Sequence, residues 1–182
     1  MRDTGDAPPL GPDGLFAFLD GLGIAHTTHR HPPLRTVEES KELRGVLPGG
    51  HVKNLFLRDK RGATWLVTAI EDTAIDLKWL AKRLEAGRFS FGSPERLEAA
   101  LGVIPGAVTP FGLVNDPGHN VRVVLDAALF RHDPLNFHPL VNDATTAIST
   151  ADFRAFLAAT GHAVTEIDFA AEMSAEGGQP AA

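Results

Sequence analysis

Cysteine is absent from this chain of 182 residues, and long apolar runs are absent as well. The lack of cysteine excludes disulfide bonds, thiolate metal sites and a cysteine nucleophile. No run approaches the ~18 consecutive apolar residues that a membrane-spanning helix needs. The first residues, MRDTGDAPPLGPDG, also lack the apolar core of a signal peptide. We therefore expect a cytoplasmic protein without a membrane partner.

An excess of positive charge is lacking too. The net charge is −6, from 17 Lys and Arg residues against 23 Asp and Glu residues. Proteins that bind nucleic acid without sequence preference are usually basic. The chain is therefore not expected to be a general DNA binder, and any contact with nucleic acid should be confined to a small patch.

Length and composition fit one globular domain, since 43% of the residues are hydrophobic and 22% are charged. We expect a single domain over residues 13–169. Residues 1–12, rich in Pro, Gly and Asp, are expected to be mobile, and the Ala- and Gly-rich residues 170–182 are expected to form a disordered tail.

Several motifs of known chemistry are missing. The chain contains no G-x-S-x-G nucleophile motif, no GxxxxGK[ST] or GxGxxG phosphate-binding loop and no HExxH metal motif. His26, His29 and His31 are closely spaced and leave a metal-dependent hydrolase as an alternative. A zinc site needs three or four converging ligands, which this spacing does not specify, so we expect neither a metal nor another cofactor.

Periodicity and turn residues predict an α+β fold. Helices are expected over 12–23, 36–45, 76–87, 93–102 and 150–161, with Thr36 and Ser93 as caps and Gly45, Gly102 and Gly161 as stops. Strands are expected over 24–30, in a hairpin over 51–70 with Gly62 in its turn, and near 88–91, 121–130, 136–150 and 162–169. Strands and long helices do not alternate regularly, so a Rossmann fold is not expected.

Polar residues in apolar surroundings are the candidates for function. In the predicted strand HVKNLFLR, Lys53 shares a face with Leu55 and Leu57, whereas Asn54 faces the other way. The GAVTP loop and the segment NFHPLVN, with His138 and Asn142, also place polar or turn-forming residues among apolar ones. The residues alone leave a structural alternative open at each position: a lysine that snorkels outward, a half-buried histidine, and ordinary turn chemistry.

Three segments together resemble a known family. The segments HVKNLFLRDKRGATWLVTAIEDTAIDLKWLAKRL, LGVIPGAVTPFGLVND and NFHPLVNDATTAIST are similar to the YbaK/ProX family of aminoacyl-tRNA editing domains, and within it to free-standing deacylases of alanyl-tRNA(Pro). The likeness runs from about residue 13 to 168. It implies a compact α+β fold with a mixed, partly barrelled β-sheet and short flanking helices.

The resemblance also implies a reaction and a site. The reaction is hydrolysis of mischarged alanyl-tRNA(Pro), with the tRNA acceptor end as partner and prolyl-tRNA synthetase as a second candidate partner. The family's catalytic positions fall on Lys53, Gly106 and His138, and Gly106 is expected to offer its N–H to the oxyanion. The family's substrate-binding positions fall on Asn54, Ala107, Val108, Thr109, Pro110, Phe111 and Asn142. The alternatives are cysteinyl- or seryl-tRNA as substrate, or a non-catalytic module that binds tRNA or a synthetase.

Overall fold

An eight-stranded mixed sheet organises the part of the chain that the computed structural model describes, residues 7–34 and 37–176. The strands are β1 (His26–Arg30), β2 (Gly50–Asp59), β3 (Thr64–Ile70), β4 (Phe89–Phe91), β5 (Val121–Asp126), β6 (Leu135–Phe137), β7 (Ala144–Ile148) and β8 (Val164–Ile167). Their order is β1-β7-β6-β2-β3-β5-β8, with β4 paired to β2. The pairs β2–β6, β3–β5 and β5–β8 are parallel, and the other pairs are antiparallel.

The predicted class is confirmed, because the sheet is mixed and the helices are short. The sheet remains open within the described residues: β1 and β8 are its two ends and do not pair. The expected barrel-like character therefore does not extend to closure. The predicted hairpin is β2–β3, with Gly62 at φ +89° in its turn, and β8 is the predicted edge strand.

The helices begin and end at residues that the sequence marks. They are α1 (Pro12–Gly21), α2 (Val37–Val46), α3 (Leu77–Arg83), α4 (Pro94–Leu101), α5 (Thr150–Thr160) and α6 (Phe169–Ala175), with 3-10 helices η1 (Pro110–Asn115) and η2 (Ala127–Arg131). The Ser93 hydroxyl caps α4, and Gly102 and Gly161 take left-handed conformations after α4 and α5. The predicted stop at Gly45 is wrong, because α2 continues to Val46; the predicted cap Thr36 lies outside the described residues.

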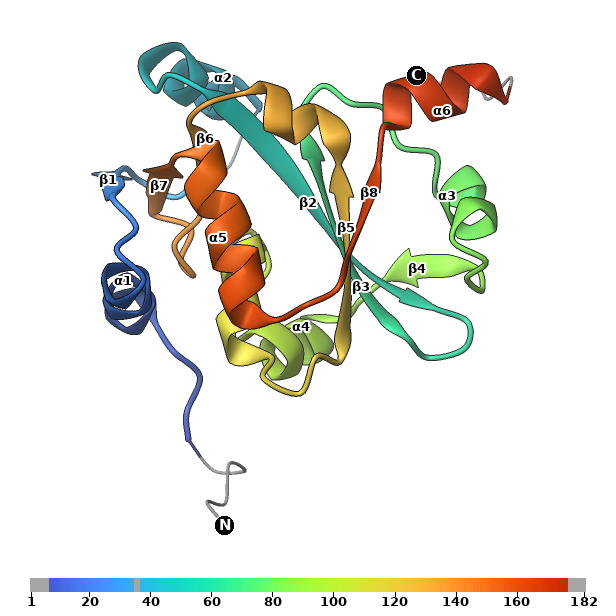
Figure 1. The fold of residues 1–182 in the computed structure, drawn as a ribbon, viewed down its shortest axis with the longest axis horizontal. Helices are drawn as coiled ribbons and strands as arrows, with labels where there is room; N and C mark the ends of the chain where they lie inside the picture. Colours follow the sequence, from blue (N-terminus) through green and yellow to red (C-terminus); the bar gives the residue numbers. More distant parts are fainter. Residues whose placement is uncertain (1–6, 35–36, 177–182) are drawn as a thin grey trace.

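Helices lie on both sides of the sheet (Figure 1), and each side has its own hydrophobic core. The larger core joins α1, α4 and α5 to the sheet, and the Phe111 ring makes edge contacts with Phe137 and Phe156, with centroids 5.3 Å away in each case. The smaller core lies under α3, β4 and α6. Both faces of β2 are thus covered over part of its length.

The chain remains folded beyond residue 169, which corrects the expected tail. Phe169 and Met173 on α6 are buried in the smaller core, and the Trp79 indole N–H donates to Glu176 at 2.7 Å. Positions four apart lie on the same side of a helix, so Phe169 and Met173 face the core together. Residues 170–175 therefore belong to the domain, and 177–182 lie outside the described residues.

The expected mobile segment at the other end is tied to the domain at Leu10. Its backbone N–H donates to the Asn115 side chain at 2.7 Å, and the Asn115 amide donates to the Leu10 carbonyl at 3.2 Å. Residues 1–6 lie outside the described residues. Among the helices that are described, none has both the length and the apolar character needed to cross a bilayer.

Candidate functional site

Lys53 and Asn54 stand on opposite faces of β2, as the alternation predicts. Lys53 lies opposite Ala69 on the face of Leu55 and Leu57, which belongs to the smaller core. The Asn54 side chain faces the other core, where its Oδ1 accepts a hydrogen bond from the Thr68 hydroxyl at 2.7 Å. Lys53 is half-buried and forms no ion pair with any described residue.

The edge of β2 that does not pair with β3 changes its partner strand near Lys53 and Asn54. Gly50 and His51 pair with β6, and pairing with β4 begins only at Leu57. Among the described strands, none pairs with this edge between these two positions, although Gly92 donates its N–H to the Phe56 carbonyl at 3.0 Å. The lysine and the asparagine therefore sit where the edge of the sheet is open.

A small polar cavity lies beside this opening. Its volume is about 110 Å³, and it is lined by Leu34, Leu43, His51, Val52, Asn54, Glu71, Asn136, Phe137, His138 and Thr145. Asn54 comes from β2, Asn136 from β6 and Thr145 from β7, so three strands that are distant in sequence build one wall. Two predicted site residues, Asn54 and His138, thus meet here. Lys53 is not among the described residues that line the cavity.

His138 is held in one orientation at the cavity. Its Nδ1 lies 3.0 Å from the Ala144 carbonyl oxygen, and its ring centroid lies 6.4 Å from that of His31. Burial lowers the pKa of His138 below its ordinary value; the hydrogen bond to Ala144 opposes this shift, and His31 adds to it. The imidazole is therefore neutral at physiological pH, with one nitrogen free to accept a hydrogen bond.

Gly106 occupies a tight turn with an unused donor. The Ala107 N–H donates to the Ile104 carbonyl at 3.0 Å, Pro105 precedes the glycine, and Gly106 has φ +90°. Proline followed by a residue with positive φ is the pattern of a type II turn. The Gly106 N–H has no acceptor among the described residues. Asn142 lies beside it, since a Cβ added at Gly106 would be 3.7 Å from the Asn142 Nδ2.

A strained residue separates His138 from Asn142. Leu140 has φ +66°, which is rare for a bulky residue, and its side chain is buried in the larger core. Such a conformation costs of order 1–3 kcal/mol and persists only when packing holds it. Burial of Leu140 thus fixes the reversal of the chain that places His138 and Asn142.

The rest of the GAVTP loop packs inward. Ala107, Thr109, Pro110 and Phe111 are buried, and Val108 is half-buried against the larger core. The Thr109 hydroxyl accepts the Phe111 N–H at 3.2 Å and caps η1. The structure places these side chains against the core, where they hold the Gly106 turn, and their expected contact with substrate stays a prediction. Phe111 also connects that turn to Phe137 of the cavity wall.

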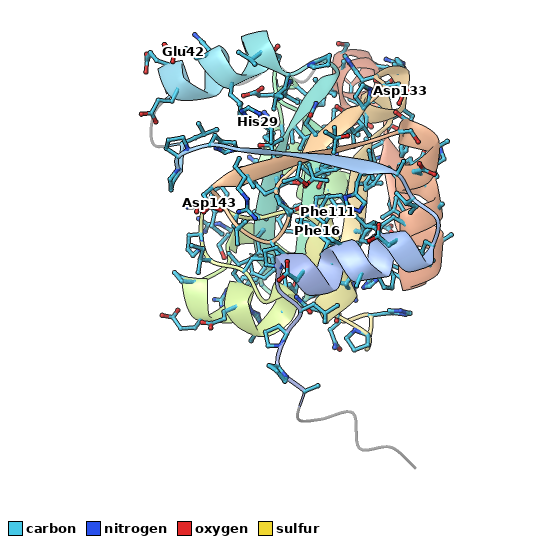
Figure 2. The ribbon with its side chains drawn as sticks, turned by 90° about the vertical axis from the view of Figure 1, so that its left-hand side faces the viewer. Phe16, His29, Glu42, Phe111, Asp133 and Asp143 are labelled. Atoms are coloured by element: carbon cyan, nitrogen blue, oxygen red, sulfur yellow. The ribbon has the colours of Figure 1, made fainter. Side chains whose placement is uncertain are left out.

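The three clustered histidines do not all meet at one point. His26 lies 2.8 Å from Asp20 and stacks on Phe16, whereas the His31 Nε2 lies 2.8 Å from the Thr145 hydroxyl. The His29 ring, on the strand β1 that crosses between α1 and α2 in Figure 2, stacks with the His31 ring at a centroid distance of 6.2 Å. No group of three or more His, Cys, Asp or Glu residues in the described part of the chain has the geometry to hold a metal ion.

Comparison with known proteins identifies the family. A sequence profile described as "Aminoacyl-tRNA editing domain" matches residues 31–156. The chain belongs to this family. This editing domain is 37% identical over 155 residues to the prolyl-tRNA editing protein ProX of Acetoanaerobium sticklandii, across 85% of this chain and 94% of the relative. The predicted resemblance and reaction class, hydrolysis of mischarged aminoacyl-tRNA, are thereby confirmed.

Two further likenesses bear on function and fold. The multifunctional Ser/Thr-tRNA deacylase ProXp-y of Escherichia coli is 29% identical over 143 residues, across 76% of this chain and 83% of the relative. A solved structure proposed to be a trans-editing enzyme for prolyl-tRNA synthetase superposes with a TM-score of 0.64 at 21% identity, over 89% of this chain and 98% of its own. The latter supports the fold of the editing domain.

Sequence reasoning missed part of the cavity wall of this editing domain. His51, Asn136 and Thr145 line the cavity. The His31 Nε2 forms a hydrogen bond with the Thr145 hydroxyl. The signal that the sequence offers for such positions is a polar residue inside a short β-prone run, and this signal indicates Asn54 and His138. Asn136 and Thr145 occur in equally short runs, but only the pairing of β6 with β2 and β7 shows that they face a common space.

Proposed function

We propose that this editing domain hydrolyses the ester that joins alanine to the terminal adenosine of tRNA(Pro), in the cytoplasm and in trans. One observation supports this most directly: a polar cavity of about 110 Å³, with Asn54 and His138 in its wall, opens at the unpaired edge of β2. Ligand pockets are commonly ~300–1,000 Å³ in volume. A cavity this small suits the aminoacyl group of a small amino acid and not a whole nucleotide.

The chemistry that we assign needs no nucleophile from the protein. Water attacks the ester carbonyl, and the oxygen of that carbonyl becomes an oxyanion. The free N–H of the Gly106 turn, with Asn142 beside it, is our candidate donor to this oxyanion. His138, neutral and with one free ring nitrogen, is our candidate to orient the water or accept its proton.

In this proposal, Lys53 binds a part of the substrate other than the aminoacyl ester. Its side chain leaves β2 on the face opposite Asn54, and it does not line the cavity. A half-buried ammonium without an ion-pair partner in the described chain is suited to an anion. We therefore assign Lys53 to the terminal phosphate or ribose of the acceptor end, and Asn54 to the aminoacyl ester.

Discrimination by size explains the use of a separate enzyme. A pocket built for proline distinguishes it from a smaller residue by only ~1–3 kcal/mol per missing methylene, so alanine enters a proline-charging site. A second, smaller cavity that admits alanine and excludes the pyrrolidine ring removes the error. Prolyl-tRNA synthetase is accordingly a candidate partner, and seryl-tRNA is a candidate second substrate because a relative is a Ser/Thr-tRNA deacylase.

The test is single-turnover deacylation of tRNA(Pro) charged with alanine, serine, cysteine or proline. We expect fast hydrolysis of alanyl-tRNA(Pro) and sparing of prolyl-tRNA(Pro), both in the presence and in the absence of EDTA. Equal rates on the alanyl and prolyl substrates would refute the assignment. A loss of activity in EDTA that zinc restores would favour the metal-dependent alternative. Binding of tRNA without any hydrolysis would favour the non-catalytic alternative.

A further inference from the structure

Phe91 is the one aromatic side chain that the structure leaves exposed. All 11 Phe and both Trp residues lie in the described part of the chain, and every ring but that of Phe91, which is 66% exposed, is buried or half-buried. The Phe91 ring belongs to neither hydrophobic core and contacts no other described ring. A single exposed apolar side chain is ordinary on a protein surface, so the indication of a site comes from its neighbours.

Phe91 lies on the same face of the sheet as Lys53. It pairs with Leu57 of β2, and residues directly opposite each other in two paired strands share a face. Lys53, Leu55 and Leu57 alternate along β2 and share that face as well. Phe89, two residues earlier in β4, is buried in the smaller core. The core therefore covers Phe89 and leaves Phe91 outside.

The Phe91 ring stands at one end of the unpaired edge of β2. Pairing between β2 and β4 begins at Leu57, which is three residues, or about 10 Å along a strand, from Asn54. The Gly92 N–H donates to the Phe56 carbonyl at 3.0 Å and holds the chain at this point. The backbone of Phe91 is thus fixed, while its ring stays open to solvent.

Cations without carboxylate partners flank the same edge. Lys53 and Arg58, both on β2, form no ion pair with any described residue. The Asp59 carboxylate next to Arg58 is buried and accepts hydrogen bonds from two backbone N–H groups and the Trp65 indole. Free cations beside an exposed ring suit a single nucleic-acid strand, which proteins bind through its phosphates and by stacking its bases on aromatic rings.

We propose that the Phe91 ring stacks on a base of the unpaired 3′ end of the tRNA, whose phosphates run along the open edge of β2 past Lys53. This contact rests on the proposed function, which puts the ester at Asn54, and it holds the nucleotide chain about 10 Å from that ester. Every base has a π-face, so stacking does not depend on the identity of the base. Phe91 therefore positions the acceptor end and leaves the choice of amino acid to the cavity.

The first experiment measures single-turnover deacylation of alanyl-tRNA(Pro) over a range of enzyme concentrations. Phe91→Ala should raise the half-saturating enzyme concentration about 5- to 150-fold, which corresponds to ~1–3 kcal/mol for the stacking of one base. The maximal rate and Tm should change little, because the ring touches neither the cavity nor a core. Phe91→Leu should resemble Phe91→Ala, and Phe91→Trp should resemble the parent, because leucine keeps apolar area without a π-face.

Leu22→Ala is the matched control for Phe91→Ala. Leu22 is also an exposed apolar residue, at 42%, but it lies at the end of α1 and lines no part of the cavity. The control should bind tRNA like the parent. Equal losses of binding in the two variants would reflect exposed apolar area in general and would overturn the stacking contact.

A coupling experiment identifies what the ring contacts. Each unpaired nucleotide before the terminal adenosine is replaced in turn by an abasic nucleotide. At the stacked position, the abasic substrate should bind the parent as weakly as the intact substrate binds Phe91→Ala, and the two changes together should cost no more than either alone. If the two effects add at every position, the ring does not stack on a base. A loss of binding to prolyl-tRNA synthetase with tRNA binding unchanged would also overturn the contact.

Binding of uncharged tRNA(Pro) separates a failure of this contact from a failure of the proposed function. If Phe91→Ala binds tRNA like the parent while both hydrolyse alanyl-tRNA(Pro), the stacking contact is overturned and deacylation stands. If alanyl-tRNA(Pro) is not hydrolysed, but Phe91 and one base are still coupled in the binding of uncharged tRNA, the proposed substrate is wrong and the contact stands.

Discussion

Substitution of Gly106 by alanine separates the conformational role of this residue from the catalytic role that we propose for it. The added Cβ would meet only the Asn142 Nδ2, at 3.7 Å, which is ordinary van der Waals contact. The protein itself thus leaves room for a methyl group, and the cost lies in the backbone, because φ is +90°. Left-handed backbone costs a non-glycine residue ~1–2 kcal/mol. At ~2–4 °C per kcal/mol for a chain of this size, Tm should fall by about 2–8 °C.

Gly62→Ala provides a matched control for Gly106→Ala. Gly62 has φ +89°, no atom within 4 Å of an added Cβ, and a position in the β2–β3 turn; neither Gly62 nor Gly106 is among the residues that line the cavity. The strain is nearly the same, so the two variants should lose similar stability. Only Gly106→Ala places a methyl group beside the proposed oxyanion donor, and its rate should fall on the order of 10–1000-fold.

The assay is single-turnover deacylation of alanyl-tRNA(Pro) at a temperature where both variants are folded, with thermal melts recorded on the same preparations. If Gly106→Ala and Gly62→Ala show equal rates and equal melting temperatures, the turn is ordinary loop structure and the oxyanion donor lies elsewhere. If Gly106→Ala melts like the parent protein, the assignment of its cost to positive φ is refuted.

Three further predictions follow from the same geometry. Lys53→Ala should change stability by less than about 0.5 kcal/mol, because no described ion pair is lost, yet it should abolish most deacylation; near-normal turnover would make Lys53 a structural residue. Phe111→Ala should cost ~3–5 kcal/mol in the free energy of unfolding, measured by urea titration, and a cost below 1 kcal/mol would contradict its burial. The lowered pKa of His138 means that the unfolded chain binds more protons below its ordinary pKa of about 6.5, so stability should fall as the pH drops through that value. The loss between pH 7 and pH 5 should be smaller in His138→Gln, and an unchanged pH dependence would contradict the shift.

The sequence predicted local structure well where short-range signals decide it. Ser93, with Pro94 after it and Gly102 eight residues further on, marks both ends of α4, and alternation along β2 places Lys53 and Asn54 on opposite faces. These features depend on backbone geometry and capping, which neighbouring residues determine. The pairing of strands and the cavity between them depend on contacts distant in sequence, which a single chain does not reveal.

The wrong prediction of a tail after residue 169 has the same physical origin. Residues 170–175 resemble a tail in composition, but Phe169 and Met173 find a partner surface on α3, and burial stabilises the short helix. Phe111, which follows the GAVTP loop in the chain, is fully buried between two other phenylalanine rings, and its expected contact with substrate stays a prediction. Position next to a candidate site residue in sequence does not decide which way a side chain faces.

The open edge of β2 explains how adjacent residues on one strand can serve one substrate. A side chain on either face of a fully paired strand would be separated from its neighbour by the sheet. Here β6 ends its pairing at His51 and β4 begins at Leu57, so the stretch of β2 between them has one edge with no partner among the described strands. An acceptor end bound along this edge would meet Asn54 and the cavity on one face and Lys53 on the other. The interruption in strand pairing is therefore the feature of the fold from which the proposed site arises.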